Sequence, residues 1–385
     1  MLYMQEVFDA MVMGGGIIGR LTAWHLAKSS KSTLLLEQHS LNHSEGSSRG
    51  SSRMFGETFA RDIYFKLARQ SRELWRELER ETGEKLLCLN GGLDIVSGTD
   101  ARKSIRELAS VLSSRKILFE VLDGASLHRR YPQWEHISKA HAIYSDSAGI
   151  LRAERCMSAA ILAAQKHGVL VREQSRVVGI KPNSSREVLL KMSSSETYRT
   201  RKLVIAAGPW MPNILGRLGI KLPLRVSQEQ TVYFTPRNNS NFFKPENFPV
   251  WEWEGEEFVY GFPAFENNGT KIAFHSDGHY LKNLREFRRT PSPSVIKRLH
   301  SFLKRHIPDA AGEAFGAITC LYTNTPDNDF VIDTVPGIPQ IAYFTGCSGH
   351  AFHCAPAIGQ ALAEIAIVGK ATLDISSFSS LRFKT

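Results

Sequence analysis

The first forty residues constrain the fold more than any other stretch. An apolar segment, Val7 to Met13, leads into the run GGGIIG at 14–19, and a helical stretch to about Ser29 follows. G-x-G-x-x-G between a strand and a helix is typical of dinucleotide binding. The first glycine permits the tight turn, the second lets a pyrophosphate reach the helix N-terminus, and the third lets helix and strand pack closely.

An acidic residue completes this motif. Glu37 lies 18 residues after Gly19, at the end of a second apolar strand. An acid at this place accepts hydrogen bonds from an adenosine ribose diol and repels a 2′-phosphate. The sequence therefore predicts a dinucleotide site and leaves FAD and NAD open as ligands. The alternative is a glycine-rich turn that binds nothing.

Length, composition and charge limit the class of protein and the number of domains. With 385 residues, 42% of them hydrophobic and 22% charged, the chain has an ordinary globular composition that suits two domains. The net charge of +10 comes from lysines and arginines spread along the chain, without a basic motif interleaved with aromatic residues. We interpret it as a solvated basic surface and expect no nucleic-acid partner.

The cysteines and apolar stretches bear on the compartment. The cysteines lack C-x-x-C spacing, which argues against a disulfide framework or a metal site and favours a reducing compartment; they are Cys88, Cys156, Cys320, Cys347 and Cys354. No early segment has the pattern of a signal peptide, and no stretch is long enough to span a bilayer. We expect a soluble cytoplasmic protein without a metal or membrane contact.

Apolar spacing predicts the later elements. Helical spacing occurs over 63–82, 105–112, 154–167, 295–306 and 355–368, and strands are expected near 169–173, 176–180, 188–192, 202–207, 330–333 and 343–345. The strand at 202–207 runs into Ala206-Ala207-Gly208-Pro209-Trp210, whose small residues let its end approach a bound cofactor. Such a strand, far from the first glycine turn, is typical of FAD proteins whose nucleotide domain is built from separated segments.

Two other stretches have alternative interpretations. The glycine- and serine-rich passage 43–53 suits a flexible surface loop or a loop around the cofactor's phosphates. Between residues 222 and 318 aromatic residues cluster, and they suit either strand alternation or the walls of an apolar substrate pocket; they are Trp251, Trp253, Phe258, Tyr260, Phe262 and Phe274.

Motifs along nearly the whole chain point to one family. Besides the glycine motif they are Gly46-Ser47-Ser48 to Arg53, Glu73-Leu74-Trp75, Tyr260-Gly261-Phe262-Pro263, Lys271 with His275, Cys320-Leu321-Tyr322-Thr323, Gly349-His350, and Gly369-Lys370 to Asp374-Ile375. With these motifs the chain resembles the monomeric sarcosine oxidase family of flavoenzymes, which includes N-methyltryptophan oxidase and pipecolate oxidase, within the D-amino-acid-oxidase-like superfamily.

The resemblance, together with the patterns above, predicts an α/β fold in two domains. A Rossmann-type FAD-binding domain of discontinuous segments takes residues 1–85, 150–222 and 322–385. An α+β substrate domain with a mainly antiparallel sheet takes residues 86–149 and 223–321.

The resemblance also implies how FAD is attached. Cys320 matches the cysteine that the family joins to the 8α-methyl of FAD. A thiolate can add to this electrophilic carbon, and the resulting thioether raises the redox potential of the flavin. From residue type alone, Cys320 would be a buried inert thiol.

The resemblance further implies the site residues. Lys271 matches a lysine that assists oxygen reduction, because a cation there stabilises a superoxide-like anion. The implied catalytic set is Lys271, His275, Tyr322, Arg53 and His353. The implied cofactor contacts are Gly14, Gly16, Ile17, Ile18, Gly19, Glu37, Gln38, Ser47, Arg49, Arg53, Ala207, Gly208, Trp210, Cys320, Gly346, Gly349, His350, Ala351, Phe352 and His353.

Two departures from the family pattern concern the substrate, and a third lies near the flavin edge. Gly56 and His353 stand where sarcosine oxidase holds the substrate carboxylate with an arginine and a lysine, and Arg49 replaces a common histidine. His353 could be protonated, and Arg61 or Arg49 could take over the carboxylate. Losing such charge-assisted pairs removes a few kcal/mol of binding, which argues against sarcosine itself and for a larger or differently anchored amine.

The resemblance thus implies a monomeric FAD-dependent oxidase of a small secondary amine, an N-alkyl or cyclic amino acid or a related amine. Hydride leaves the α-carbon for flavin N5, and molecular oxygen becomes hydrogen peroxide. Three alternatives stay open: a flavin amine dehydrogenase with a non-oxygen acceptor, a tRNA-modifying FAD oxidase, and a non-catalytic flavin protein with a degenerate pocket.

Overall fold

The N-terminal strand lies in the middle of a sheet. A computed structural model of the chain describes residues 7–183, 186–238, 240–266 and 269–383. In it β1 (Val7–Met13) pairs in parallel with β2 (Thr33–Leu36) and with β12 (Thr197–Ile205). The order across the sheet is β10, β11, β12, β1, β2 and β9; β20 also pairs with β12, and β19 with β20. The other bounds are β9 Leu170–Arg172, β10 Val177–Pro182, β11 Val188–Met192, β19 Val331–Val335 and β20 Ile338–Thr345.

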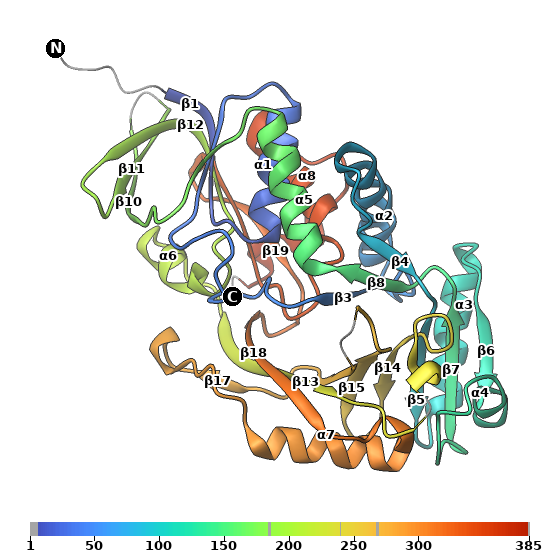
Figure 1. Ribbon diagram of the computed structural model, residues 1–385. Helices are drawn as coiled ribbons and strands as arrows, with labels where there is room; N and C mark the ends of the chain where they lie inside the picture. The colour runs from blue at the N-terminus through green and yellow to red at the C-terminus, as the bar shows by residue number, and fades with distance from the viewer. Residues whose placement is uncertain (1–6, 184–185, 239, 267–268, 384–385) are drawn as a thin grey trace.

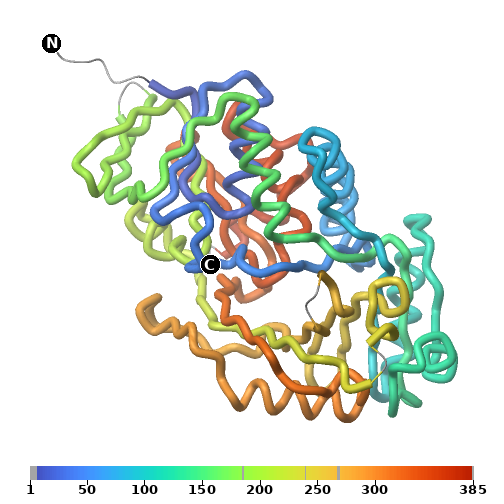
Figure 2. The backbone as a smooth tube through the Cα atoms, in the orientation of Figure 1, coloured from blue at the N-terminus to red at the C-terminus, as the bar shows by residue number. Residues whose placement is uncertain are grey.

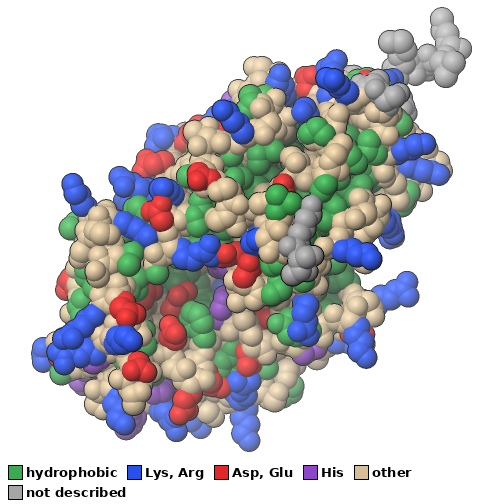
Figure 3. Space-filling model, turned by 180° about the vertical axis from the view of Figure 1, so that it is seen from behind, with side chains coloured by type: hydrophobic (Ala, Val, Ile, Leu, Met, Phe, Trp, Pro, Cys, Tyr) green, Lys and Arg blue, Asp and Glu red, His purple; other side chains and the backbone are tan. Residues whose placement is uncertain are grey.

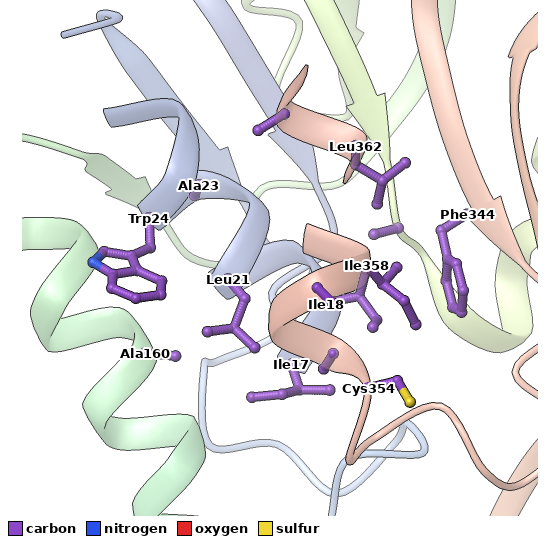
Figure 4. Packing of buried hydrophobic residues seen from close by; sticks show 14 of the residues in the cluster. Ile17, Ile18, Leu21, Ala23, Trp24, Ala160, Phe344, Cys354, Ile358 and Leu362 are labelled. Carbon is purple, nitrogen blue, oxygen red and sulfur yellow. The ribbon is translucent and has the colours of Figure 1, made fainter. Parts of the chain in front are cut away.

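Helices cover this first sheet. α1 (Ile17–Lys28) is buried almost all round, because it lies between the sheet, α5 (Ala153–Lys166) and α8 (Ala355–Val368). Figure 4 shows Ile17, Ile18 and Leu21 of α1 beside Ile358 and Leu362 of α8, with Trp24 on the side of α5. α2 (Asp62–Thr82) packs on α5 and α8, and α6 (Met211–Arg217) follows β12.

A second, mainly antiparallel sheet lies below the first in Figure 1. Its order is β17, β13, β16, β15, β14, β5, β7 and β6, with β18 also paired to β13; the β14–β5 pair is parallel. The strands are β5 Gly92–Ser97, β6 Glu120–Asp123, β7 Ala140–Ser145, β13 Arg225–Phe234, β14 Val250–Glu254, β15 Phe258–Phe262, β16 Thr270–Phe274, β17 His279–Leu281 and β18 Ala314–Asn324. Beside them lie α3 (Ala101–Ser114), α4 (Gly124–Arg130) and α7 (Pro293–His306).

A small sheet joins the two parts. It consists of β3 (Ser52–Phe55), β8 (Gly149–Arg152) and β4 (Leu87–Leu89). In Figure 2 the upper part contains blue, green and red chain, whereas the lower part contains cyan, yellow and orange chain. Each part is therefore assembled from separated segments. The predicted α/β fold is confirmed, while the domain boundaries stay a prediction.

Candidate active site

The glycine turn uses its three glycines in different ways. A Cβ on Gly14, whose φ is +113°, would lie 2.4 Å from the carbonyl oxygen of Ala206, and one on Gly19 would lie 1.8 Å from that of Gly14. A Cβ on Gly16 would meet only the Ser48 hydroxyl, at 3.3 Å. Gly14 and Gly19 are thus required by packing, whereas Gly16 lines a cavity at the N-terminus of α1.

An ionised carboxylate lies beside this turn. Glu37 accepts hydrogen bonds from the N–H of Gly15 at 2.7 Å and of His39 at 2.8 Å, and His43 Nε2 is 3.6 Å away. Burial alone would raise the pKa of Glu37, but the hydrogen bonds from His43, His39 and Gly15 outweigh it and lower the pKa. Glu37 and Gln38 both line the cavity, next to Ala207, Gly208 and Trp210.

A buried arginine holds the turn, and the sequence analysis missed it. Arg20 is 1% exposed. Its guanidinium donates to the carbonyls of Gly15 at 2.7 Å and Met157 at 2.8 Å, and also to that of Leu41. Burial lowers the pKa of Arg20 to about 10, against the raising effect of Glu37 and Glu173. Arg20 thereby connects the turn, the loop after β2 and α5.

The passage 43–53 lies across the cavity and is anchored to the second sheet. The Ser47 hydroxyl donates to the Leu321 carbonyl at 2.6 Å. Arg53 donates to the carbonyls of Ser52 at 2.8 Å, Ser47 at 3.0 Å and Arg49 at 2.5 Å, and its guanidinium lies 5.3 Å from the centroid of the Phe352 ring. Ser47, Arg49 and Arg53 all line the cavity.

A buried lysine and a thiol from the second sheet also line the cavity. Lys271 of β16 is 4% exposed, and its ammonium donates to the Ser52 carbonyl at 2.9 Å and to the Ser52 hydroxyl at 3.3 Å. Burial, and then repulsion from Arg53, hold the pKa of Lys271 well below its usual value. Cys320 of β18 is a free thiol whose pKa burial raises to about 11, although Arg53 and Lys271 oppose the rise.

Strand alternation places Tyr322 beside Cys320. Residues two apart on a strand share a face, so Cys320 and Tyr322 both line the cavity. The hydroxyls of Tyr322 and Tyr260 are hydrogen bonded, and the His275 ring lies 5.9 Å from that of Tyr322. Burial, with a smaller contribution from His350, lowers the pKa of His275 to about 4, so this imidazole is neutral near pH 7.

The turn before α8 closes the cavity. Gly349 has φ +83°, and a Cβ there would lie 2.2 Å from the Tyr322 ring, so glycine is required. Gly349, His350, Ala351, Phe352 and His353 all line the cavity. Gly346 and Gly19 do not: a Cβ on Gly346 would lie 2.7 Å from the Thr325 side chain, behind the wall.

The three groups considered for a substrate carboxylate have different fates. Burial, and then His350, lower the pKa of His353 to about 3, so His353 is neutral near pH 7. Arg61 forms an ion pair with Asp329, which also accepts a 2.9 Å hydrogen bond from Tyr64, and Arg61 does not line the cavity. Arg49 does line it.

The cavity measures about 840 Å³ and brings together residues from both sheets. Figure 3 shows a hollow on the rear face, with acidic and histidine side chains around it. Of the catalytic and cofactor-contact residues that the resemblance implies, all but Gly19 and Gly346 line this one cavity.

The aromatic cluster is only partly in the cavity wall. Tyr260 and Phe262 line the cavity. Trp251, Trp253 and Phe274 instead lie in the core on the other face of the sheet, and Phe258 is 37% exposed. The expectation of a pocket wall is thus wrong for these four residues. Alternation directs Trp251, Trp253 and Phe274 to the core face, whereas Phe258 shares a face with Tyr260 but lies at the exposed end of β15, outside the cavity.

Two acidic wall residues were also missed. Asp94 of β5 and Glu252 of β14 line the cavity and are register partners. Their neighbours Leu93, Trp251 and Trp253 lie in the core. An acid between large apolar residues of a strand is a signal that it faces away from the core, and it was present in the sequence.

The chain matches known proteins along almost its whole length. The family described as FAD dependent oxidoreductase (DAO) matches residues 9–365. The chain belongs to this family. Peroxisomal sarcosine oxidase from Homo sapiens is 31% identical over 98% of this chain and 97% of its own length. Monomeric sarcosine oxidase from Bacillus sp. (strain NS-129) is 30% identical over 98% and 97%.

Solved structures share the fold. NikD, described as an unusual amino acid oxidase essential for nikkomycin biosynthesis, has a TM-score of 0.85 at 21% identity, covering 97% of both chains. L-proline dehydrogenase from P. horikoshii has a TM-score of 0.86 at 21% identity, covering 99% and 98%. These structures show the fold, while the family match and the sarcosine oxidase relatives confirm the predicted resemblance and the enzyme class, an FAD-dependent oxidoreductase.

The cavity fits FAD by its own chemistry. Gly16 leaves the N-terminus of α1 open where a pyrophosphate binds, and the ionised Glu37 suits a ribose diol. No helix in the described part of the chain is both long enough and apolar enough to cross a membrane.

Proposed function

We propose that this protein is a monomeric FAD-dependent oxidase of a small secondary amine. The supporting observation is that the glycine turn, Lys271 and Cys320 line one cavity. When bound, FAD supplies the redox chemistry, taking a hydride equivalent from the amine's α-carbon and passing the electrons to oxygen, which yields hydrogen peroxide. The two-domain division predicted above and a cytoplasmic location belong to the same proposal; the human relative is named as peroxisomal.

The chain's own residues would provide a dry site that binds the neutral amine. His275 and His353 are uncharged near pH 7 and offer ring nitrogens to an amine N–H. Tyr260, Tyr322 and Phe262 supply aromatic walls. Lys271 would stabilise negative charge that develops on oxygen, held in place by Ser52.

Cys320 would hold FAD through a thioether. Its support is position: Cys320 lies on the cavity wall, where the side chains of Arg53 and Lys271 offset part of the rise in its pKa that burial causes. Arg49 and Arg53, with the turn from Gly349 to His353, would contact the rest of the cofactor.

The test combines flavin attachment and turnover. We expect acid-precipitated wild-type protein to retain its yellow flavin and the Cys320→Ser variant to release it, with Cys88→Ser as a matched control that retains it. Anaerobic bleaching of the flavin by a secondary amine, and peroxide formation in air, would support the oxidase. Flavin in the wild-type supernatant would exclude the thioether. Bleaching without peroxide would indicate a dehydrogenase, and no bleaching by any amine would refute the proposed function.

A further inference from the structure

One part of the cavity wall is acidic and has no assigned role. Asp94 and Glu252 are register partners on the parallel strands β5 and β14, which lie about 4.8 Å apart in such pairs. Register partners on neighbouring strands direct their side chains to the same face. The core residues Leu93 and Trp253 occupy the other face, so both carboxyl groups meet the cavity.

These two acids lack a cationic partner. Among the described residues no lysine or arginine forms an ion pair with either carboxyl group. Asp94 is hydrogen bonded to Thr58, whereas the carboxyl group of Glu252 has only the negative charges of Asp94 and Glu254 as electrostatic neighbours. Burial raises the pKa of both acids, and repulsion from Asp94 raises that of Glu252 further. A pair of this kind gains most from a bound positive charge.

Of the groups considered for a substrate carboxylate, Arg49 alone lines the cavity with a cationic side chain, and the other positions do not hold an anion. Gly56 has no side chain, His353 is uncharged near pH 7, and Arg61 is committed to Asp329. His353 also carries an unused polar atom: it is 8% exposed, lines the cavity, and its Nε2 makes no hydrogen bond among the described residues. Its ring lies 5.4 Å from that of Phe59, the neighbour of Thr58, so it stands at the same end as Asp94.

We propose that Asp94 and Glu252 form a cation subsite of the amine pocket, and that the substrate carries a second, protonated nitrogen remote from the oxidised C–N bond. This inference rests on the proposed amine oxidation and names its substrate class. The acids bind the distal ammonium by charge-assisted hydrogen bonds, while the reacting amine stays neutral between the aromatic walls. The neutral His353 accepts or donates a hydrogen bond at the same end.

Three amines of equal length test the subsite. They are N-methyl-1,4-diaminobutane, N-methylpentylamine and 5-(methylamino)pentanoate, which differ in an ammonium, a methyl or a carboxylate end. The dissociation constant of each is obtained from the concentration dependence of anaerobic flavin bleaching in the holoenzyme. We expect the diamine to bind roughly tenfold or more tightly than N-methylpentylamine, and the carboxylate more weakly than both.

Variants locate the effect. The preference for the diamine is the dissociation constant of N-methylpentylamine divided by that of N-methyl-1,4-diaminobutane. Asp94→Asn and Glu252→Gln should each reduce this ratio roughly fivefold or more. Glu256→Gln removes an exposed charge from the turn after the same strand, outside the cavity, and its ratio should stay as in wild type. Flavin content and visible spectrum show that each variant is folded.

The possible outcomes distinguish a failure of the cation subsite from a failure of the proposed amine oxidation. Bleaching by N-methylpentylamine without a preference for the diamine, or a preference for the carboxylate, would overturn the cation subsite and keep the amine oxidase. Equal weakening of all three amines in both variants would assign the acids to folding or proton transfer and also overturn it. If none of the amines bleaches the flavin, both proposals fail.

Discussion

Alanine substitutions at two glycines of the turn should affect cofactor binding and folding separately. Gly16→Ala places a Cβ in the cavity, 3.3 Å from the Ser48 hydroxyl, which can rotate. Gly16 has φ −71° and ψ 178°, values that alanine adopts freely. Gly19→Ala places a Cβ 1.8 Å from the backbone oxygen of Gly14, which cannot rotate away. The same methyl group therefore meets two different environments three residues apart.

The magnitudes follow from these contacts. For Gly16→Ala, a poorer N-cap costs up to about 1 kcal/mol, and the lower entropy of the unfolded chain returns about 0.4–1 kcal/mol. The apoprotein should hence change by less than about 1 kcal/mol. Gly19→Ala overpacks the contact of α1 with β1, at about 3 kcal/mol, which lowers the Tm of a chain of 385 residues by roughly 4 °C.

FAD affinity should respond directly to Gly16→Ala, whereas Gly19→Ala acts mainly on folding. The Cβ at residue 16 stands where the pyrophosphate approaches, and a clash of about 1–3 kcal/mol weakens FAD binding roughly 5- to 150-fold. Both variants are measured in a Cys320→Ser background, so that binding is reversible, by flavin fluorescence titration and by thermal unfolding of the apoprotein. Wild-type FAD affinity in Gly16→Ala, or an equal loss of Tm in both variants, would refute the division of roles.

Two further outcomes are expected. Lys271→Met should slow flavin reoxidation by oxygen about 10²- to 10³-fold, because a unit charge about 4 Å from an anion contributes about 4 kcal/mol at an effective dielectric of 20. In stopped-flow measurements the wild-type reoxidation rate should fall as pH rises, since Lys271, with its lowered pKa, loses its charge at a lower pH than an ordinary lysine. A pH-independent wild-type rate would contradict this. Burial, and then Lys28, lower the pKa of His25 to about 3, so its stability contribution is present above its unfolded pKa of about 6.5 and is lost as pH falls toward 3. His25→Leu should therefore move the acid-unfolding midpoint to lower pH in circular dichroism, and an unchanged or higher midpoint would show that His25 does not drive acid unfolding.

Local patterns predicted much of the first sheet and its helices. The strand Val7–Met13 and the helices at α2 and α8 were predictable because apolar period and glycine ends are read from neighbours in sequence. Cys320 and Lys271 were found only through the family resemblance, since neither residue type has a local signal. The structure shows that both line the cavity, and their roles stay predictions.

Other residues depended on contacts between distant segments. The sequence shows that Trp251 and Glu252 face opposite sides of β14, but not which side meets the cavity. The partner of Glu252 across the sheet, Asp94, comes from a strand far away in the chain. Arg20 was missed because its three acceptors lie in the turn, the loop after β2 and α5.

The central place of β1 has a consequence for biosynthesis. β1 lies between β2 and β12, β12 needs β20, and α1 is covered by α8, whose Gly359 would place a Cβ 2.9 Å from the Thr22 backbone nitrogen. β1 and α1 therefore leave the ribosome long before β20 and α8, which complete the cover of their apolar surfaces. Such non-local pairing is slow and leaves hydrophobic surface exposed during synthesis. We expect the yield of native protein to depend on slow translation and on chaperones that shield the N-terminal strand–helix unit.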